Sequence, residues 1–553
     1  MQKSFTVSGY LVHRLQEIGV NHLFGVPGDY NLDFLDDVMI SPIRWVGNCN
    51  ELNAGYAADG YARLNGIGAA VVTYGVGGMS ILNAVAGAYA EHVPMIVING
   101  APAARRRESE AMVHHLVAHY YLQLEIFKKI TADAAMLTDP FTAPDEIDRV
   151  LRSCLTSKLP VYIELPCDIV RASCKAPVKA LTVTPAVSNP DSLAEAVKEA
   201  AGLLHSAANP IILAGIELLR FKLGSETLRL VESSEIPFAT MLGSKSVLPE
   251  LHPQFTGIYQ GGWSKKQVQD QVEGSDCLLS LGAWMTDLDT GLFSINLDKR
   301  HMIEVGQGKV RIGGHFYPQV ELSDFIRELT SQVQPRSYLT SHPALSYQPK
   351  QPFIPRPACE LTATRLYDCL NYYLDDQMVL LSEPGDAFCA TPEFHIEEAE
   401  NFIVQSYYCS IGFCTPAALG VSLARPGKRP VILTGDGAFQ MTAQELSTLI
   451  RERCAAIFVL VNNDGYLIER KLHQDGAYNN LQMWRYASLP EAFGGSSFAT
   501  GIHATTEEEL NDAFKLALSE PGRLIFIEAF LPKRDCSRGL ERLGESFRKS
   551  QQK

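Results

Sequence analysis

The sequence predicts an α/β protein of three domains, each built around a doubly wound parallel sheet. Its 553 residues suffice for about three domains of ordinary size. Short apolar runs, which we expect to form buried strands, alternate along the chain with segments of helical periodicity. Two proline-containing stretches without helical periodicity separate these blocks. The predicted domains are residues 1–180, 190–335 and 357–540.

The first domain is predicted as alternating helices and strands that end with a buried strand at 160–166. The GVGG sequence at 75–78 lacks the third glycine of a dinucleotide-binding motif, so we expect a tight turn there. The helix expected after residue 50 carries a face of small residues that would let another backbone approach closely. These residues are Ala54, Ala57, Ala58 and Ala62.

The second domain is predicted from apolar runs that follow a linker at 176–190. No complete GxGxxG sequence with a downstream acidic residue accompanies these runs, so we assign no nucleotide to this domain. A second proline-containing linker is expected at 337–356. The strands expected between the two linkers are 210–214, 236–240, 277–281, 296–297 and 302–305.

Two polar turns dominate the third domain. Apolar strands are expected at 431–434 and 456–461 with a helix between them, which places both following turns at the carboxyl edge of a parallel sheet. The first turn contains Asp436, and the second contains Asn463 and Gly465. A carboxylate, an amide oxygen and a backbone carbonyl are typical ligands of Mg²⁺.

The glycines beside Asp436 extend this interpretation to a diphosphate. Gly435 and Gly437 would let the backbone approach a phosphate group, and the start of the next helix favours anions. The alternative is a pair of ordinary surface turns. Two such turns, each after an apolar strand, favour a site for Mg²⁺ and a diphosphate.

Composition and charge exclude several classes of protein. The net charge is 48 − 62 = −14, which argues against nucleic acid and anionic membranes as partners. The twelve cysteines include no CxxC pair, which favours a reducing compartment. No signal-peptide core is present at the N-terminus, and no apolar run is long enough to cross a bilayer. We therefore expect a soluble cytoplasmic protein.

The two turns of the third domain resemble the signature of thiamine-diphosphate enzymes. The wider sequence, including GYLIE at 465–469, resembles the 2-oxo acid decarboxylases that act on pyruvate, indolepyruvate, phenylpyruvate or branched-chain oxo acids. This resemblance extends over nearly the whole chain. It implies three domains of the thiamine-diphosphate enzyme type, with thiamine diphosphate and Mg²⁺ as cofactors. The metal ligands that it implies are Asp436, Asn463 and Gly465.

The resemblance also assigns a role to Glu51. By itself, a glutamate in the first turn of a helix is favoured by the helix dipole and needs no other explanation. In the family, a glutamate before an AxxAxGYAR helix hydrogen-bonds the aminopyrimidine ring, which promotes removal of the thiazolium C2 proton. The cofactor-binding residues implied are Glu51, Cys409, Ile411, Gly435, Asp436, Gly437, Asn463 and Gly465.

Asp29, His114, His115 and Glu469 match family residues that transfer protons during decarboxylation and product release. Adjacent histidines on a helix point in different directions, so we do not expect this pair to chelate a metal. The sequence after His115 is apolar and aromatic, unlike that of pyruvate-type enzymes, and leaves the substrate open. The pocket residues implied are Leu288, Phe388, Ile468 and Leu472.

The expected reaction is therefore non-oxidative decarboxylation of a 2-oxo acid to an aldehyde and CO₂, with an aromatic or branched-chain acid favoured. Glu51 and Asp436 lie far apart in the sequence, and the resemblance implies that they meet across a subunit interface of a homodimer or homotetramer. A carboligase of the acetolactate-synthase type and a catalytically silent structural or regulatory homologue are the alternatives. A nicotinamide oxidoreductase lacks its fingerprint. The charged C-terminal segment, 534–553, is expected to be either a flap or a frayed tail.

Overall fold

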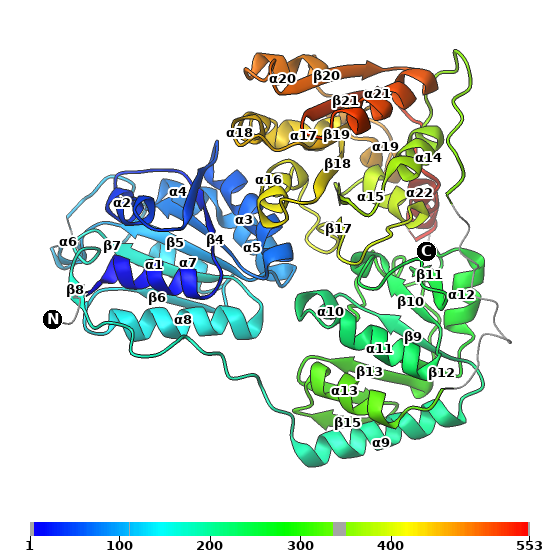
Figure 1. Ribbon diagram of the computed structural model, residues 1–553, viewed down its shortest axis with the longest axis horizontal. Coiled ribbons are helices and arrows are strands. Elements are labelled where there is room, and N and C mark those ends of the chain that lie inside the picture. The colour runs from blue at the N-terminus through cyan, green and yellow to red at the C-terminus, as the bar shows by residue number, and fades with distance from the viewer. Residues whose placement is uncertain (1–4, 110, 336–349, 551–553) are drawn as a thin grey trace.

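The computed structural model describes residues 5–109, 111–335 and 350–550 and contains three α/β domains, each around its own sheet (Figure 1). This arrangement confirms the predicted fold class. The first and third sheets each have six parallel strands, in the orders β3-β2-β4-β5-β7-β6 and β17-β16-β18-β19-β21-β20. If the strands of each six-stranded sheet are numbered 1 to 6 in chain order, both sheets have the order 2-1-3-4-6-5. The two domains therefore share one topology.

The first domain begins with a short strand that pairs with the last strand of the domain, antiparallel and outside the main sheet. Its central strands are buried along their whole length because helices cover both faces of the sheet. The elements are β1 (Phe5–Thr6), α1 (Val7–Glu17), β2 (His22–Gly25), α2 (Leu32–Met39), β3 (Arg44–Gly47), α3 (Glu51–Asn65), β4 (Gly68–Thr73), α4 (Val76–Ser80), α5 (Leu82–Ala90), β5 (Met95–Ala101), α6 (Ala104–Glu108), α7 (Leu122–Phe127), β6 (Asp133–Met136), α8 (Ala143–Ser157), β7 (Val161–Pro166) and β8 (Ser173–Cys174).

The second domain has five parallel strands in the order β11-β10-β9-β12-β13, extended at one edge by the antiparallel strands β14 and β15. The strand expected at 296–297 was predicted wrongly, because this segment forms no ladder. The elements are α9 (Pro190–Ser206), β9 (Pro210–Ala214), α10 (Glu217–Arg220), α11 (Gly224–Ser234), β10 (Phe238–Met241), β11 (Phe255–Tyr259), α12 (Lys266–Glu273), β12 (Cys277–Leu281), β13 (Met302–Gly306), β14 (Lys309–Ile312), β15 (His315–Pro318) and α13 (Leu322–Gln332).

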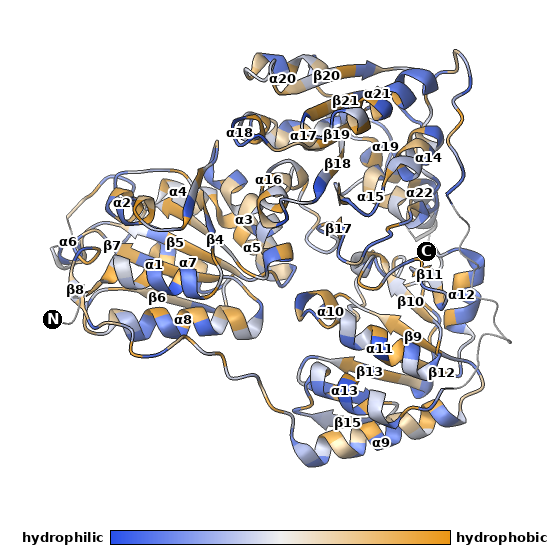
Figure 2. Ribbon diagram, in the orientation of Figure 1, coloured by the Kyte–Doolittle hydropathy of each residue, from blue (hydrophilic) through white to orange (hydrophobic). Residues whose placement is uncertain are grey.

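The third domain follows the predicted second linker, most of which lies outside the described residues. Its apolar strands form the centre of the domain, as the hydropathy colouring shows (Figure 2). The elements are α14 (Ala363–Tyr373), β16 (Met378–Ser382), α15 (Asp386–Ala390), β17 (Phe402–Ile403), α16 (Cys414–Ala424), β18 (Arg429–Gly435), α17 (Asp436–Thr442), α18 (Glu445–Arg451), β19 (Ile457–Asn462), α19 (Leu467–Leu472), α20 (Leu489–Ala492), β20 (Ala499–Ala504), α21 (Glu507–Ser519), β21 (Leu524–Phe530) and α22 (Arg538–Ser550).

Helices α3 and α16 join the first domain to the third through direct contact of their backbones. A Cβ on Gly60 would lie 2.5 Å from the carbonyl oxygen of Ala417, and one on Gly420 would lie 2.0 Å from that of Ala57. The predicted small-residue face of α3 therefore packs against another helix of the same chain. No helix in the described ranges is long and apolar enough to cross a membrane.

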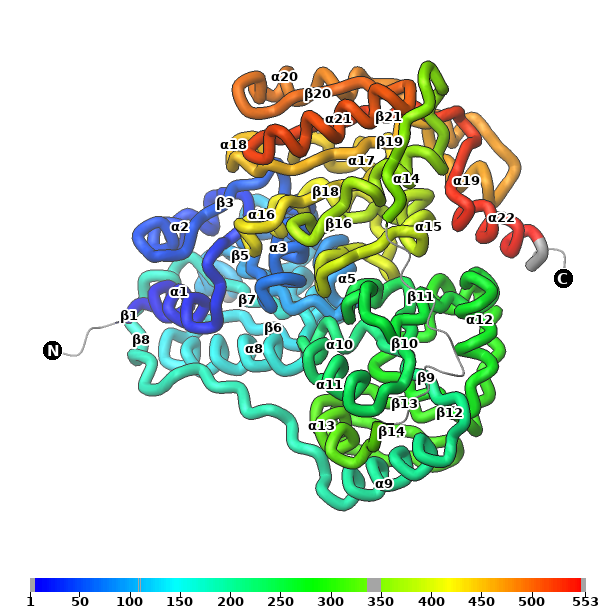
Figure 3. Tube along the Cα trace, turned by 45° about the vertical axis from the view of Figure 1, so that its right-hand side comes forward, coloured from blue at the N-terminus to red at the C-terminus, as the bar shows by residue number. Residues whose placement is uncertain are grey.

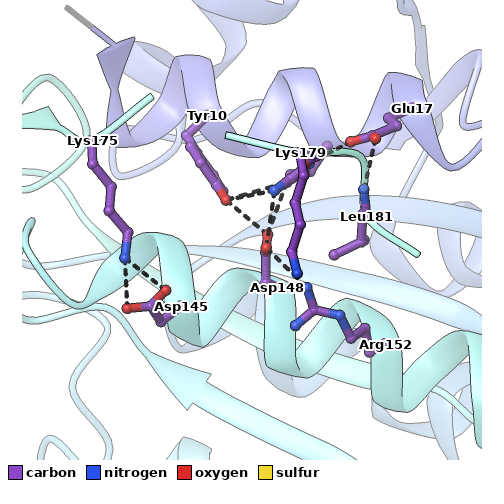
Figure 4. A network of polar contacts seen from close by, with 9 residues as sticks. Tyr10, Glu17, Asp145, Asp148, Arg152, Lys175, Lys179 and Leu181 are labelled. Atoms are coloured by element: carbon purple, nitrogen blue, oxygen red, sulfur yellow. Dashed lines mark hydrogen bonds and ion pairs between the residues drawn. The ribbon is translucent and has the colours of Figure 1, made fainter. Parts of the chain in front are cut away.

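A buried arginine ties the first linker to two helices of the first domain. Arg14 of α1 is 2% exposed and donates hydrogen bonds to both carboxylate oxygens of Asp148, at 2.8 and 3.0 Å. It also donates to Glu17 at 2.6 Å and to the carbonyl of Lys179 at 2.9 Å. Figure 4 shows Tyr10 and Asp148 pointing toward each other between the helices, with Lys179 on the linker above.

Replacing Arg14 by methionine is expected to destabilise the first domain by about 3–5 kcal/mol, because the carboxyl group of Asp148, 12% exposed at its side chain, loses its main partner. The measurement is the first thermal unfolding transition of the purified protein. Arg152→Met is the control, since Arg152 is 40% exposed at its side chain and makes one contact of 3.3 Å with Asp148. Equal melting temperatures of the two variants would contradict the role of Arg14 as the main partner of Asp148.

Candidate active site

The two polar turns of the third domain lie side by side at the carboxyl edge of its sheet. Strands β18 and β19 are parallel neighbours, with Gly435 opposite Val461. Asp436, the first residue of α17, is 1% exposed and accepts hydrogen bonds from the backbone N–H groups of Gly437, at 2.7 Å, and Gly465, at 3.0 Å. The carboxylate of one turn thus binds the backbone of the other.

The donor atoms at these turns fit a hard divalent cation. The amide oxygen of Asn463 is buried and has no hydrogen-bond partner among the described residues. Burial raises the pKa of the Asp436 carboxyl to about 6, although hydrogen bonds from backbone N–H groups and the charge of Arg470 act in the opposite direction. An unpartnered amide oxygen beside a buried carboxylate is a set of protein oxygens that suits Mg²⁺.

Glycines keep this edge open for a phosphate group. A Cβ on Gly435 would meet nothing within 4 Å, whereas a Cβ on Gly437 would lie 2.5 Å from the ring of Tyr466. Gly465 has a φ of +125°, and a Cβ there would lie 2.0 Å from the carbonyl oxygen of Asn479. Only glycine therefore fits this turn without a shift of the backbone.

The arginine that holds the second turn was not predicted from the sequence. Arg470 of α19 is 5% exposed and donates hydrogen bonds to the carbonyls of Asp464, at 2.6 Å, and Asn479, at 3.1 Å. It therefore fixes the backbone on which Asn463 and Gly465 lie. An arginine five residues after a glycine turn is a weak signal, because on an isolated helix it would be assigned to the surface.

Two adjoining cavities open from these turns. A cavity of about 110 Å³ is lined by Gly435, Asp436, Gly437, Asn463 and Gly465, and a neighbouring cavity of about 240 Å³ by Leu288, Cys409 and Phe388. The wall that the two cavities share separates the smaller one, at the candidate cation site, from the larger one, which we call the apolar chamber. It consists of Pro384, Gly385, Ile411, Ile468 and Glu469.

The pocket residues are placed as follows. Leu288, Phe388 and Ile468 line the larger cavity, and the exposed carboxylate of Glu469 lies at its junction with the smaller one. Leu472 differs from its predicted position. It packs against the apolar cluster of Leu540 and Leu543 beneath α22 and is not among the residues that line either cavity.

The segment that carries Cys409 and Ile411 is anchored where the three domains meet. Buried Glu91 of the first domain accepts hydrogen bonds from the N–H groups of Tyr407, at 2.8 Å, and Tyr408, at 3.1 Å, and pairs with Arg220 of the second domain at 3.3 Å. Cys409 has a φ of +55°, in the left-handed region that favours glycine. Burial raises the pKa of its thiol to about 12, so it is no nucleophile at neutral pH.

A protonated glutamate supports the turn between β16 and α15. Glu383 is 1% exposed, accepts a hydrogen bond from the N–H of Cys414 at 2.9 Å, and has one carboxyl oxygen without a partner among the described residues. Burial raises the pKa of this carboxyl to about 8. Residues 384 and 385, which follow it, line both cavities.

This raised pKa predicts a stability that falls as the pH rises. Between the unfolded pKa of about 4.3 and the folded pKa of about 8, the folded state binds more protons, so ionisation opposes folding. Glu383→Gln is expected to be more stable than the unmodified protein by about 1–3 kcal/mol at pH 8, with a smaller difference at pH 5. Thermal unfolding at both values measures this. In Glu398→Gln, at an exposed position, the difference in stability from the unmodified protein should not change with pH. The same pH dependence in both variants would refute the raised pKa of Glu383.

Asp29, His114 and His115 come together at the corresponding edge of the first domain. Nε2 of His114 lies 2.5 Å from one carboxylate oxygen of Asp29, and Nε2 of His115 lies 3.9 Å from the other. The expectation that the two histidines point apart on a helix was wrong. Residues 111–117 form no helix: His114 and His115 lie in a turn, and His115 has a φ of +67°, with the two ring centroids 4.7 Å apart.

Glu51 reaches the same edge at the start of α3. A Cβ on Gly77 would lie 3.2 Å from a carboxylate oxygen of Glu51, and one on Gly75 would lie 2.0 Å from the carbonyl oxygen of His115. Gly75 also has a φ of +66°, in the tight turn that the sequence predicted. The glycines of this turn therefore let the Glu51 and His115 segments approach one strand end.

Within one chain, the two groups of site residues remain apart. None of Asp29, Glu51, His114 and His115 lines either cavity of the third domain. The residues around Glu51 instead bind the same chain through buried Glu445 of α18. Its carboxylate accepts hydrogen bonds from the Asn48 side chain at 2.8 Å, the Cys49 N–H at 3.1 Å and the Asn53 side chain at 2.8 Å.

These features are those of an enzyme that binds a diphosphate cofactor on one of two domains of the same topology and carries acid–base groups on the other. Three parts of the chain match descriptions of the thiamine pyrophosphate enzymes. Residues 5–129 match the N-terminal TPP binding domain, 197–333 the central domain, and 387–529 the C-terminal TPP binding domain. The chain belongs to this family, and thiamine diphosphate is its cofactor.

Several curated relatives cover almost the whole chain. An alpha-keto-acid decarboxylase of Mycobacterium leprae (strain TN) is 39% identical over 537 residues, which are 96% of this chain and 94% of that protein. The alpha-keto-acid decarboxylase of Mycobacterium tuberculosis (strain ATCC 25618 / H37Rv) is 37% identical over 546 residues, 98% of this chain and 96% of that protein. The similarity therefore includes all three domains.

Proposed function

We propose that this protein catalyses the non-oxidative decarboxylation of a 2-oxo acid to an aldehyde and CO₂, with thiamine diphosphate and Mg²⁺. The observation that carries the proposal is the Asp29–His114 contact of 2.5 Å at the sheet edge that corresponds to the cation site. Decarboxylation requires a proton donor after CO₂ leaves, and a carboxylate–imidazole pair is suited to that task. The names of the relatives support the same reaction.

Each group of site residues in this chain has its own proposed role. Asp436, Asn463 and the carbonyl of Gly465 would hold Mg²⁺, and the backbone at Gly435 and Gly437 would receive the diphosphate. When bound, thiamine diphosphate supplies a nucleophilic carbon and an acceptor for the electron pair released with CO₂. Glu51 would hydrogen-bond the pyrimidine ring, and Ile411 would pack against the cofactor. Asp29, His114, His115 and Glu469 move protons to the product.

The substrate side chain is proposed to be bulky, either aromatic or branched. The cavity of about 240 Å³ beside Ile411 is lined mainly by apolar side chains. Its Phe388 is 4% exposed and Trp263 is 6% exposed, which provides two aromatic surfaces. Pyruvate, with its single methyl group, would leave most of this apolar surface without contact.

A second copy of the chain is proposed to complete each site. Asp29, Glu51, His114 and His115 are absent from both cavities of the third domain in the same chain. A symmetric dimer can bring the first domain of one protomer to the third domain of its partner, and vice versa. We therefore infer a homodimer at least, and a dimer of dimers as the complete assembly.

The test is an assay with thiamine diphosphate and Mg²⁺, in which aldehyde formation is coupled to an alcohol dehydrogenase. Phenylpyruvate, indolepyruvate, 4-methyl-2-oxopentanoate and pyruvate serve as substrates, and acyloins are measured in parallel. Aldehyde as the main product, with pyruvate the poorest substrate, is expected. Acyloin as the main product would favour a carboligase, and no turnover of any substrate would refute the proposed reaction.

A further inference from the structure

One nitrogen of an arginine at the far end of the apolar cavity lacks a hydrogen-bond partner, although the side chain as a whole is 35% exposed. Arg542 of α22 lines the cavity of about 240 Å³, and its Nε is buried without a hydrogen-bond partner among the described residues. The ion pair recorded for its guanidinium is with Glu393, at 3.9 Å. Glu393 is already paired with Lys265 at 3.0 Å. A buried, unsatisfied guanidinium nitrogen is unfavourable unless a ligand accepts its hydrogen bond.

The position of Arg542 is opposite to the reacting end of the pocket. Ile411 and Glu469 form the wall shared with the cation site, whereas Arg542 lines a third cavity, of about 540 Å³, together with Gln260 and Trp263. These residues therefore lie at the end of the substrate chamber away from Asp436. A substrate whose reacting carbon lies beside Ile411 would extend its side chain toward Arg542.

Helix α22 is held firmly enough to present this arginine. Leu540 is fully buried, and Leu543 packs with Trp263 and Leu467 in one apolar cluster. The indole N–H of Trp263 donates a hydrogen bond of 2.9 Å to the hydroxyl of Ser546. Figure 3 shows α22, in red, beside α19 and above α12 of the second domain. The predicted flap or frayed tail is thus a helix through residue 550 that covers the chamber.

We propose that Arg542 recognises a carboxylate at the far end of the substrate side chain. Among substrates of equal chain length, the protein would then prefer the 2-oxo acid with a second, terminal acidic group, whether or not its side chain is also aromatic or branched. This proposal builds on the proposed function and specifies its substrate class. The apolar walls contact the middle of the side chain, while the guanidinium donates to both oxygens of the terminal carboxylate. Glu393 competes weakly for the same guanidinium.

The experiment compares 2-oxoadipate with 2-oxohexanoate, which share a six-carbon chain and differ in the terminal carboxylate. The ratio of their kcat/KM values is expected to be at least about 10 in the unmodified holoenzyme. It should fall by about 10- to 100-fold in Arg542→Met, because a charge-assisted hydrogen-bonded pair is lost. In Glu393→Gln the ratio should rise by about 2- to 5-fold, because the competing carboxylate is removed.

Arg538→Met provides the matched control. Arg538 is an exposed arginine one turn earlier on α22 and lines none of the three cavities. The ratio of kcat/KM for 2-oxoadipate to that for 2-oxohexanoate in Arg538→Met should therefore equal that of the unmodified protein. Calorimetric titration of glutarate into each holoenzyme adds a measurement independent of turnover, and binding weakened by Arg542→Met but not by Arg538→Met is expected.

The outcomes separate this proposal from the proposed function. Turnover of phenylpyruvate with no preference for 2-oxoadipate, or an unchanged ratio in Arg542→Met, overturns the role of Arg542 alone. Equal loss of glutarate binding in both arginine variants also overturns it, because a general charge effect would then be responsible. Failure of all 2-oxo acids to yield aldehyde overturns the proposed function instead.

Discussion

Glu51→Gln is expected to reduce kcat for aldehyde formation by about 10²- to 10⁴-fold, the usual contribution of a positioned acid–base group. Glutamine preserves the size of the side chain and its place at the start of α3, where Gly77 leaves room for it. It removes the exchangeable proton that the proposed role requires. The assay is the coupled measurement of aldehyde at saturating thiamine diphosphate and Mg²⁺.

Two controls distinguish loss of chemistry from loss of structure. Binding of thiamine diphosphate to Glu51→Gln, followed by tryptophan fluorescence, should change much less than kcat, because the proposed metal and diphosphate ligands are on another domain. Glu146→Gln replaces a first-turn glutamate of α8 whose side chain is 41% exposed, and it should retain full activity. An active Glu51→Gln variant would leave Glu51 as a helix-capping residue only.

Asp436→Ala is expected to abolish stable retention of the cofactor. The variant loses the anionic oxygen of the cation site and the acceptor for the N–H groups of Gly437 and Gly465. Loss of groups around a metal commonly costs 10- to 100-fold in affinity, so a direct ligand should cost at least about 100-fold. Thiamine diphosphate and Mg²⁺ remaining after gel filtration would be measured chemically on the purified protein.

Asp464→Asn is the matched control for this variant. Asp464 lies next to Asn463, but its carboxylate points to Lys533, at 3.0 Å, and is 48% exposed. Neutralising an exposed ion pair should change cofactor retention little. If both aspartate variants lose the cofactor equally, the net charge of the turn is responsible and Asp436 is not a specific ligand. If neither loses it, the cation site lies elsewhere.

The local elements of the site could be predicted from the sequence because short-range patterns set them. Apolar runs before Asp436 and Asn463 become β18 and β19, and the glycines between strand and helix become the turns. Each of these features depends on residues within one βαβ unit. The residue types at the turns also limit the chemistry, since carboxylate and amide oxygens beside glycines suit a hard cation and a phosphate.

Other parts of the site depend on contacts that no local pattern reports. The turn at 114–115 brings His115 to Gly75, and an assumption of helical geometry placed the two histidines wrongly. In the sequence, Arg470 and Arg542 look like surface residues, yet one binds the backbone of the turn that carries Asn463 and the other lines the apolar cavity. Leu472 is apolar on the expected helix but packs beneath α22.

What the sequence by itself determined is the kind of protein: three α/β domains, a pair of turns whose residue types suit Mg²⁺ and a diphosphate, and a family resemblance that the matches to all three domains confirm. Periodicity and turn chemistry act over a few residues, so they can be read without coordinates. Only the tertiary structure decided which side chains converge, because sheet order and helix packing join residues far apart in the chain. It joins Asp29 to His114, keeps both away from the cavities of the same chain, and leaves Arg542 unsatisfied at the far end of the apolar chamber.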